Sequence, residues 1–181
     1  PIWAGLGARY ALLRREVPLP DNIERATILV TAVQSGSMEK LLGAYRLYID
    51  GVAVGIGPGR GGGRTAAYSD GGDVNHTYYD TFDISATARS VAASAPTRSL
   101  ALGLQCYHAS GDASAGALLE LHLTLKNGSK RAVFSSSSDG HWLAYDATAA
   151  FGPTGATGQY GAPQEWALSG LMPSGWSRPG F

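Results

Sequence analysis

The stretch Tyr45-Arg-Leu-Tyr-Ile-Asp-Gly-Val-Ala-Val-Gly55 decides the fold of this chain of 181 residues. Apolar and polar residues alternate on both sides of Asp50-Gly51, a dipeptide that accepts the positive φ angles of a two-residue hairpin turn. The glycine-rich segment 57–61 follows, and the segment 78–84 (YYDTFDI) has the pattern of a returning strand. The sequence therefore predicts a hairpin, a glycine-rich crossing and a return strand, which are the parts of a β-sandwich.

Comparable patterns mark strands along most of the chain. Asn127-Gly128 is a second hairpin signal of the same kind. Ser85 precedes a short helical run, 86–93, where its hydroxyl is expected to accept from the first free backbone N–H groups, and Pro96 is expected to end the helix. Strands are expected at residues 10–19, 26–33, 45–49, 52–55, 78–84, 99–107, 118–126, 130–135 and 141–145. We therefore predict an all-β fold, a single jelly-roll-like β-sandwich of two mainly antiparallel sheets over residues 1–181.

The composition argues against some classes of function but does not identify one. Apolar residues make up 44% of the chain, enough for a core, and 25 Gly and 9 Pro suit short strands joined by turns. The formal net charge is zero, so no basic field favours nucleic acid as a partner. We expect no membrane partner, because no apolar run reaches the length of a span. Cys106, the single cysteine, lies in an apolar run and is expected to be buried.

The order of these segments resembles the N-terminal β-sandwich domain of bacterial and fungal α-L-rhamnosidases. In that family an "ELYLNG-x-x-VG" hairpin leads through a Gly/Pro loop to a "Y-x-T-x-DVT" strand. The matching segments here are 45–55, 57–61 and 79–85. Further matches follow in the same order at 2–4, 10–18 (YALLRREVP), 26–32 (ATILVTA), 119–130, 139–142 (DGHW), 160–161, 165, 175–176 (GW) and 179–181 (PGF). The collinear order across nearly the whole chain carries the resemblance.

The resemblance implies a non-catalytic module. The catalytic acidic residues of the family lie in a separate helical barrel, and no long segment with helical periodicity occurs here. We expect a carbohydrate-binding or buttressing module of an α-L-rhamnosidase-like glycoside hydrolase. Its expected partners are a rhamnose-containing glycan and the catalytic barrel of the same polypeptide. Pro1 stands where a methionine would begin a chain and Phe181 falls inside a family-like motif, so both ends are expected to be cuts in a longer polypeptide.

Aromatic side chains near strand ends and loops are the candidates for holding a sugar. An aromatic ring stacks on the C–H face of a sugar while polar groups bind its hydroxyls. The predicted carbohydrate-binding residues are Tyr68, Tyr78, Tyr107, His108 and Trp142. Tyr79 and Phe82 are expected to face the core and the opposite sheet, respectively.

Three oxygen-bearing side chains, Asp70, Asp73 and Asn75, lie within six positions of a glycine-rich loop. Oxygen ligands of this type suit calcium, and sugar-binding modules related to the rhamnosidase domain use calcium to hold rhamnose. A calcium site is therefore a hypothesis, with a solvated turn as the alternative. The corresponding family loop reads "APGWTDY", whereas the segment 57–75 is longer and has no tryptophan, so no site can be transferred from that loop.

Two segments match the N-glycosylation acceptor pattern, at Asn75 and at Asn127. Asn127 is expected at an accessible hairpin tip. In a secreting eukaryote an attached glycan would place the protein outside the cell, and extracellular (secreted) is the expected location.

Other chemical patterns have simpler interpretations. The segment 57–62 fits G-x-G-x-x-G, but no helical periodicity follows it, so a nucleotide site is not expected. The four histidines lack metal-ligand spacing, and His122 is expected to face solvent beside Glu120 and Thr124. No pair of carboxylates can be selected as a glycosidase acid and nucleophile. Apart from calcium, no cofactor is expected.

Two other functions stay open from the sequence. A free-standing sandwich with exposed edges joins copies of itself into an extracellular fibre or coat. Alternatively, the 181 residues are a complete small hydrolase.

Overall fold

The computed structural model describes residues 2, 8–33, 43–57, 79–94, 98–108, 116–134 and 141–148. Within these ranges the chain is built from strands and one helix. In chain order they are β1 (Tyr10–Pro18), β2 (Ile23–Val33), β3 (Gly43–Ile49), β4 (Val52–Gly57), β5 (Asp80–Asp83), α2 (Ser85–Ser94), β6 (Ser99–His108), β7 (Gly116–Leu125), β8 (Lys130–Phe134) and β9 (Leu143–Asp146).

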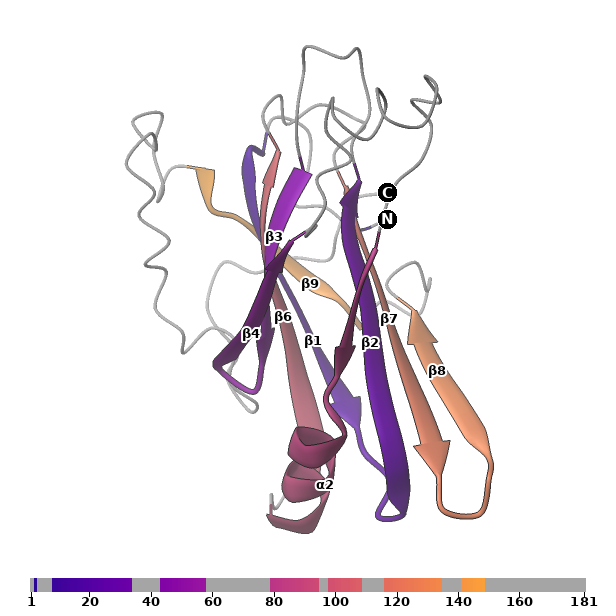
Figure 1. The fold of residues 1–181 in the computed structure, drawn as a ribbon. Coiled ribbons are helices and arrows are strands. Elements are labelled where there is room, and N and C mark those ends of the chain that lie inside the picture. Colours follow the sequence, from indigo (N-terminus) through magenta and orange to yellow (C-terminus); the bar gives the residue numbers. More distant parts are fainter. Residues whose placement is uncertain are drawn as a thin grey trace, which may run out of the picture.

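The strands form two sheets that pack face to face (Figure 1). The five-stranded sheet has the order β4-β3-β6-β1-β9, and the four-stranded sheet has the order β5-β2-β7-β8. Every pairing in these sheets is antiparallel. β4 and β8 lie on opposite sides of the molecule in Figure 1, and α2 lies across one end. The predicted all-β sandwich is confirmed, while the jelly-roll connectivity stays a prediction.

The Asp50-Gly51 turn has the geometry that the sequence predicts. Asp50 has φ 47° and Gly51 has φ 81°, and Ile49 pairs directly with Val52. Two consecutive positive φ angles between paired residues define the two-residue turn whose twist matches the flanking strands. The hairpin of β3 and β4 therefore forms at the expected residues.

The Asn127-Gly128 turn is longer than a two-residue loop. Gly128 has φ 81°, but Asn127 does not have a positive φ. The Gly128 N–H donates to the Leu125 carbonyl at 2.8 Å, and the Leu125 N–H donates to the Ser129 carbonyl at 2.9 Å. Such a turn places one extra residue before β8 and so sets which residues of β8 face those of β7.

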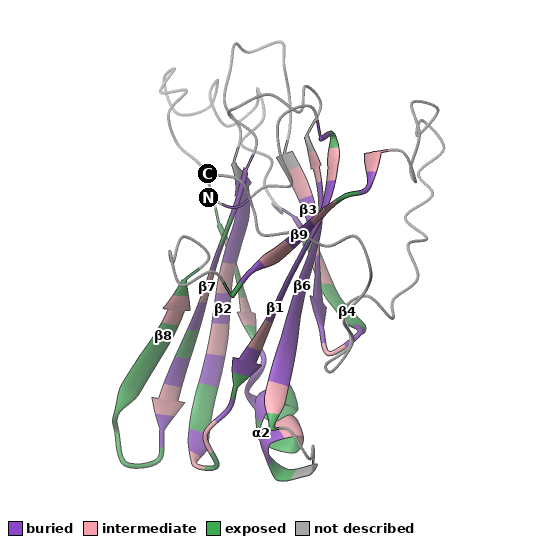
Figure 2. Cartoon of the chain, turned by 180° about the vertical axis from the view of Figure 1, so that it is seen from behind, coloured by how far each residue is buried: buried purple, intermediate pink, exposed green. Residues whose placement is uncertain are grey.

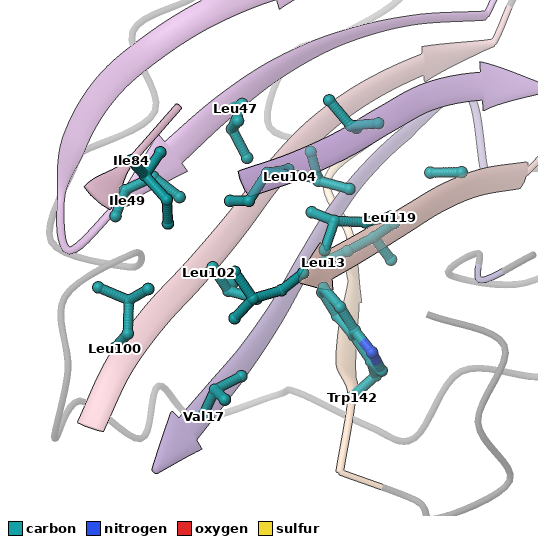
Figure 3. Packing of buried hydrophobic residues seen from close by; sticks show 14 of the residues in the cluster. Leu13, Val17, Leu47, Ile49, Ile84, Leu100, Leu102, Leu104, Leu119 and Trp142 are labelled. Carbon is teal, nitrogen blue, oxygen red and sulfur yellow. The ribbon is translucent and has the colours of Figure 1, made fainter. Parts of the chain in front are cut away.

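The core lies between the sheets. Leu13 of β1, Leu47 of β3, Leu102 of β6 and Leu119 of β7 point into it, and each is fully buried. Figure 3 labels these side chains within the cluster of buried residues, with Leu13 of one sheet beside Leu119 of the other. Figure 2 shows that burial concentrates on the central strands, whereas β8 and the outer side of α2 are exposed. Cys106 is buried in this core, as predicted.

Glycines let β4 approach β5 of the other sheet. A Cβ on Gly55 would overlap the ring of Phe82, and one on Gly57 would overlap Asp80 and the Tyr45 hydroxyl. The Tyr45 hydroxyl donates a hydrogen bond to Asp80 Oδ2, joining β3 of one sheet to β5 of the other. Phe82 thus faces the opposite sheet, as expected.

The start of α2 differs from the predicted cap. The Ser85 hydroxyl donates to Asp83 Oδ1 at 2.5 Å and accepts from the Ala26 N–H of β2 at 2.9 Å. The Asp83 carboxylate accepts the Ser85 backbone N–H at 2.9 Å, and the Ile84 carbonyl accepts the Ala88 N–H. The predicted role of Ser85 as the cap is therefore wrong: Ser85 ties the helix to β2, and Asp83 accepts at the helix start.

Other expectations at this level have clear outcomes. The predicted strands are present in the described ranges, with ends that differ by a few residues. Tyr79 does not face the core, because it lies before β5 and is exposed. In the part of the chain that the structure describes, α2 is too short to cross a bilayer and no other helix has the length and hydropathy to do so.

Candidate functional site

The outer side of the four-stranded sheet carries a mixed apolar and polar surface. Its side chains come from alternate positions of β5, β2, β7 and β8. Leu29 pairs with Thr81 and Glu120, and Glu120 pairs with Phe134. The next row joins Thr27 to His122. We call this surface the open face and define it by Thr27, Leu29, Thr81, Glu120, His122 and Phe134.

An aromatic ring, an imidazole and a carboxylate meet on the part of the open face formed by β7 and the edge strand β8. The rings of His122 and Phe134 are edge to face, with centroids 6.2 Å apart and an angle of 85°. His122 Nε2–H donates to Glu120 Oε2 at 2.8 Å. Phe134 is 42% exposed, and the other two side chains are about as accessible. The cluster is therefore accessible to solvent, and His122 contacts Phe134 through its ring and Glu120 through a hydrogen bond.

This arrangement suits a ligand with an apolar face and hydroxyl groups. The Phe134 ring offers area for C–H contact, and Glu120 keeps a second carboxylate oxygen that can accept a hydroxyl. Thr27 and Thr81 add hydroxyls that donate and accept. Leu29 lies between them and adds apolar area. Sugars combine these two kinds of surface, so the open face is the candidate site.

The outer side of the five-stranded sheet is aromatic but largely covered. Tyr10 and Tyr107 lie ring to ring, with centroids 4.9 Å apart and an angle of 43°. The Tyr48 hydroxyl donates to Gln105 Oε1 at 3.3 Å, and both side chains are buried. Tyr107, a predicted sugar-binding residue, is half-buried against Tyr10. This side therefore offers less accessible ring surface than the open face.

Trp142, another predicted sugar-binding residue, belongs to the core. Its side chain is 2% exposed and lies among the buried leucines in Figure 3, beside Leu13. A sugar cannot stack on a ring that is already covered on both faces. The prediction of an accessible indole at this position is therefore wrong.

The remaining predicted ligands fall where nothing can be said of their side chains. Tyr68, Tyr78, Asp70, Asp73 and Asn75 lie outside the described residues. His108 ends β6, and its side chain is also outside them. Among the residues that are described, no three His, Cys, Asp or Glu side chains are grouped to hold a metal ion.

Asn127 lies at the exposed tip between β7 and β8. Its Oδ1 accepts the Ser129 N–H at 3.0 Å and the Ser129 hydroxyl at 2.7 Å. The acceptor sequence is therefore accessible on the surface, as expected. Its modification stays a prediction.

Two buried ionisable groups have strongly shifted pKa values. Burial raises the pKa of the Cys106 thiol, which therefore stays protonated. Burial, and then the hydrogen bond to Asp80, raises the pKa of the Tyr45 hydroxyl. Both groups thus act as neutral parts of the core and of the link between the sheets.

The sequence placed Glu120 and His122 on the solvent side of their strand, but it did not identify the cluster that they form with Phe134. Alternation in the segment 118–126 places Glu120 and His122 on the solvent side, as the structure confirms. Phe134 had no assigned role, because its position depends on the register of β8. The Asn127-Gly128 turn was the available signal, since it brings Phe134 opposite Glu120.

Comparisons with known proteins identify the fold. No family model matches the chain, and no curated protein matches it significantly. An α-L-rhamnosidase from Streptomyces avermitilis, solved with L-rhamnose, matches 95% of this chain with a TM-score of 0.57 and 21% identity. The α-L-rhamnosidase from Dictyoglomus thermophilum matches 99% with a TM-score of 0.60 and 16% identity. A Pleurotus ostreatus lectin in complex with GalNAc matches 98% with a TM-score of 0.53 and 18% identity.

The chain has the fold of a segment of an α-L-rhamnosidase. The resemblance inferred from the sequence is thus confirmed at the level of the fold. The match covers 12% of the Streptomyces enzyme, 19% of the Dictyoglomus enzyme and 40% of the lectin. The chain therefore spans well under half the length of the proteins that it resembles.

Proposed function

We propose that this chain is a non-catalytic carbohydrate-binding module of an α-L-rhamnosidase-like glycoside hydrolase, and that it holds sugar on the open face. The observation that carries the proposal is the exposed Phe134 ring beside the His122–Glu120 pair. Support comes from the fold, which is shared with rhamnosidases and with a lectin solved with a sugar. The proposed ligand is a rhamnose-containing glycan, and the proposed location is extracellular.

The geometry suggests how a sugar would lie. Its C–H face would rest on Phe134, and its hydroxyls would reach Glu120 on β7 and the threonines of β2 and β5. Glycosylation at Asn127 would be compatible with this pose. Asn127 lies in the turn beyond the other end of β8, and the rise of that strand from Lys130 to Phe134 alone is about 13 Å.

Calorimetric titration tests the proposal with rhamnose, rhamnosides and GalNAc, each with and without calcium. Phe134→Ala is expected to weaken binding about tenfold, because the stacking surface is lost. Glu120→Ala is expected to weaken it by about the same factor, since a hydroxyl loses its acceptor. Ile56→Ala, an exposed apolar residue of the other sheet, is the matched control and should keep the affinity of the unaltered chain.

The outcome separates the two roles of such a module. Binding that Phe134→Ala weakens supports the proposal, and a calcium requirement would add an ion to it. Binding that both open-face variants leave unchanged would move the sugar site elsewhere. Silence toward every glycan in both conditions would overturn sugar binding and leave only the buttressing of a neighbouring catalytic barrel.

A further inference from the structure

The edge strands of the two sheets differ in charge. β5 carries Asp80 and Asp83, β8 begins with Lys130 and Arg131, and β9 ends with Asp146. β4 has the sequence VAVGIG, with six residues and no charge. Among the edges of the described sheets, β4 is thus the one that carries no ionisable side chain.

β4 also turns its apolar side chains to solvent. Val52 is 65% exposed and Ile56 is 66% exposed, although both are residues that folding usually covers. Gly55 and Gly57 occupy the inward positions against β5, so no side chain of β4 is needed to fill the core there. The exposed side chains of the strand therefore lie at its edge, Val52 on the side of the sheet that Ile49 faces and Ile56 on the side that Arg46 faces.

An edge strand of this kind is exposed to pairing with another strand. In the sheets that the structure describes, no strand pairs with its outer N–H and C=O groups, and natural edges usually prevent pairing with charges, prolines, short length or bulges. β4 has a single such device, a register shift in its pairing with β3 between Leu47 and Tyr48. That irregularity leaves Val52 and Ile56 exposed, so it does not cover the edge.

We infer that β4 pairs antiparallel with β4 of a second copy of this chain. A twofold axis would place a strand beside the identical strand of the second copy. The side chains of that strand must therefore be compatible with a second set of the same side chains. β5 would place Asp80 of one copy against Asp83 of the other, which is unfavourable across a strand pair, and β8 would bring the cations of Lys130 and Arg131 into the junction. β4 would bring only valine, alanine, isoleucine and glycine to the junction, with no charge to desolvate.

The pairing would join two five-stranded sheets into one continuous sheet. The exposed valines and isoleucine of both copies would lie together along the junction and lose contact with water. The open face is on the other sheet, so a dimer would carry two such faces, and neither would be covered by the junction.

Sedimentation equilibrium over about 1 to 200 μM tests the inference on the full 181-residue chain. The chain is expected to shift with concentration from 18.8 kDa to twice that mass. The double variant Val52→Lys/Ile56→Lys is expected to raise the dimer dissociation constant at least about tenfold, because like charges are then brought together at the junction. Val52→Glu/Ile56→Glu is expected to do the same.

Mixing the two charged variants makes the test specific. An equimolar mixture is expected to dimerise again, since the lysines of one copy then lie at the junction with the glutamates of the other. Leu118→Lys/Phe134→Lys adds the same charge to exposed apolar positions of the four-stranded sheet and should leave the dimer intact. Circular dichroism confirms that each variant is folded.

Three outcomes would overturn the inference. A chain that stays at 18.8 kDa over the whole range excludes it and leaves the β4 edge for a different protein or domain. Charged β4 variants that dimerise as the unaltered chain does would place the contact elsewhere. Variants that are monomeric alone and also when mixed would show that edge charge, rather than pairing of β4 with β4, controls association.

Discussion

Both β4 and β8 follow an Asx-Gly turn and both lie at the edge of a sheet, but the inward sides of the two strands differ. In β4, Gly55 and Gly57 face the other sheet. In β8, Val133 faces the other sheet and packs against the core. At β4 the two sheets thus approach each other closely because no side chain separates them. At β8 a side chain fills the space between the sheets instead. A glycine in an edge strand here marks close approach of the opposite sheet rather than a weak strand.

The largest effect should come from adding one methyl group at Gly57. Gly57→Ala would press a Cβ into the Tyr45–Asp80 hydrogen bond. We expect a loss of about 2 to 3 kcal/mol of unfolding free energy, from overpacking together with the broken bond. Urea denaturation measures it, and a loss below about 0.5 kcal/mol would show that β4 and β5 are not tightly packed.

Gly55→Ala should cost less, about 1 to 2 kcal/mol, because the three atoms nearest to its Cβ all belong to the Phe82 ring and no hydrogen bond is broken. The cause can be isolated with Phe82→Leu, which shortens that side chain. The double variant Gly55→Ala/Phe82→Leu should lose less stability than the sum of the two single losses, since the overlap is relieved. Additive losses in the same denaturation experiment would contradict the contact.

Gly128→Ala separates backbone strain from crowding. Nothing lies within 4 Å of a Cβ at this position, but the φ of 81° is unfavourable for alanine. A loss of about 1 kcal/mol is expected. Gly128→Asn should lose less, because asparagine adopts this conformation more readily. Equal losses for the two variants would show that conformation is not the cause.

The smallest effect concerns Asp83, at the end of β5. The Ser85 hydroxyl, and then the Ser85 backbone N–H, lower the pKa of its carboxyl below the ordinary value of 3.8. A pKa that folding lowers adds stability above the unfolded value, and that stability is lost as the pH falls through the folded value. The cost of Asp83→Ala should therefore be larger at pH about 7 than below pH about 3. A cost that does not change with pH, measured by denaturation at both, would rule out this coupling.

Local patterns predicted the strands and turns because each depends on neighbouring residues. Asp50-Gly51 forms the expected two-residue turn, and Cys106 is buried as its apolar run indicated. Ser85 was assigned to the wrong bond because the N–H group that its hydroxyl accepts belongs to Ala26, which lies on a distant strand. Alternation describes one strand at a time, whereas this contact depends on how two elements pack.

The candidate site escaped prediction for the same reason. Trp142 lies just before the short strand β9, so the alternation of residues does not show which side of the sheet its side chain faces. Its burial could therefore not be derived from the sequence. Phe134 meets His122 and Glu120 because the turn before β8 contains one more residue than a two-residue loop. Sequence reasoning recognised the turn but not its length, and the length places the ring.

The order of strands in the five-stranded sheet sets when the protein can form. Pro18 at the end of β1 pairs with Ser99 at the start of β6, and the other neighbour of β1 is β9. At about 5 to 20 residues per second, a ribosome needs roughly 4 to 16 s to make the chain between those two residues. The first strand is therefore made long before either neighbour exists, so its apolar residues stay unpaired until β6 and then β9 have been synthesised.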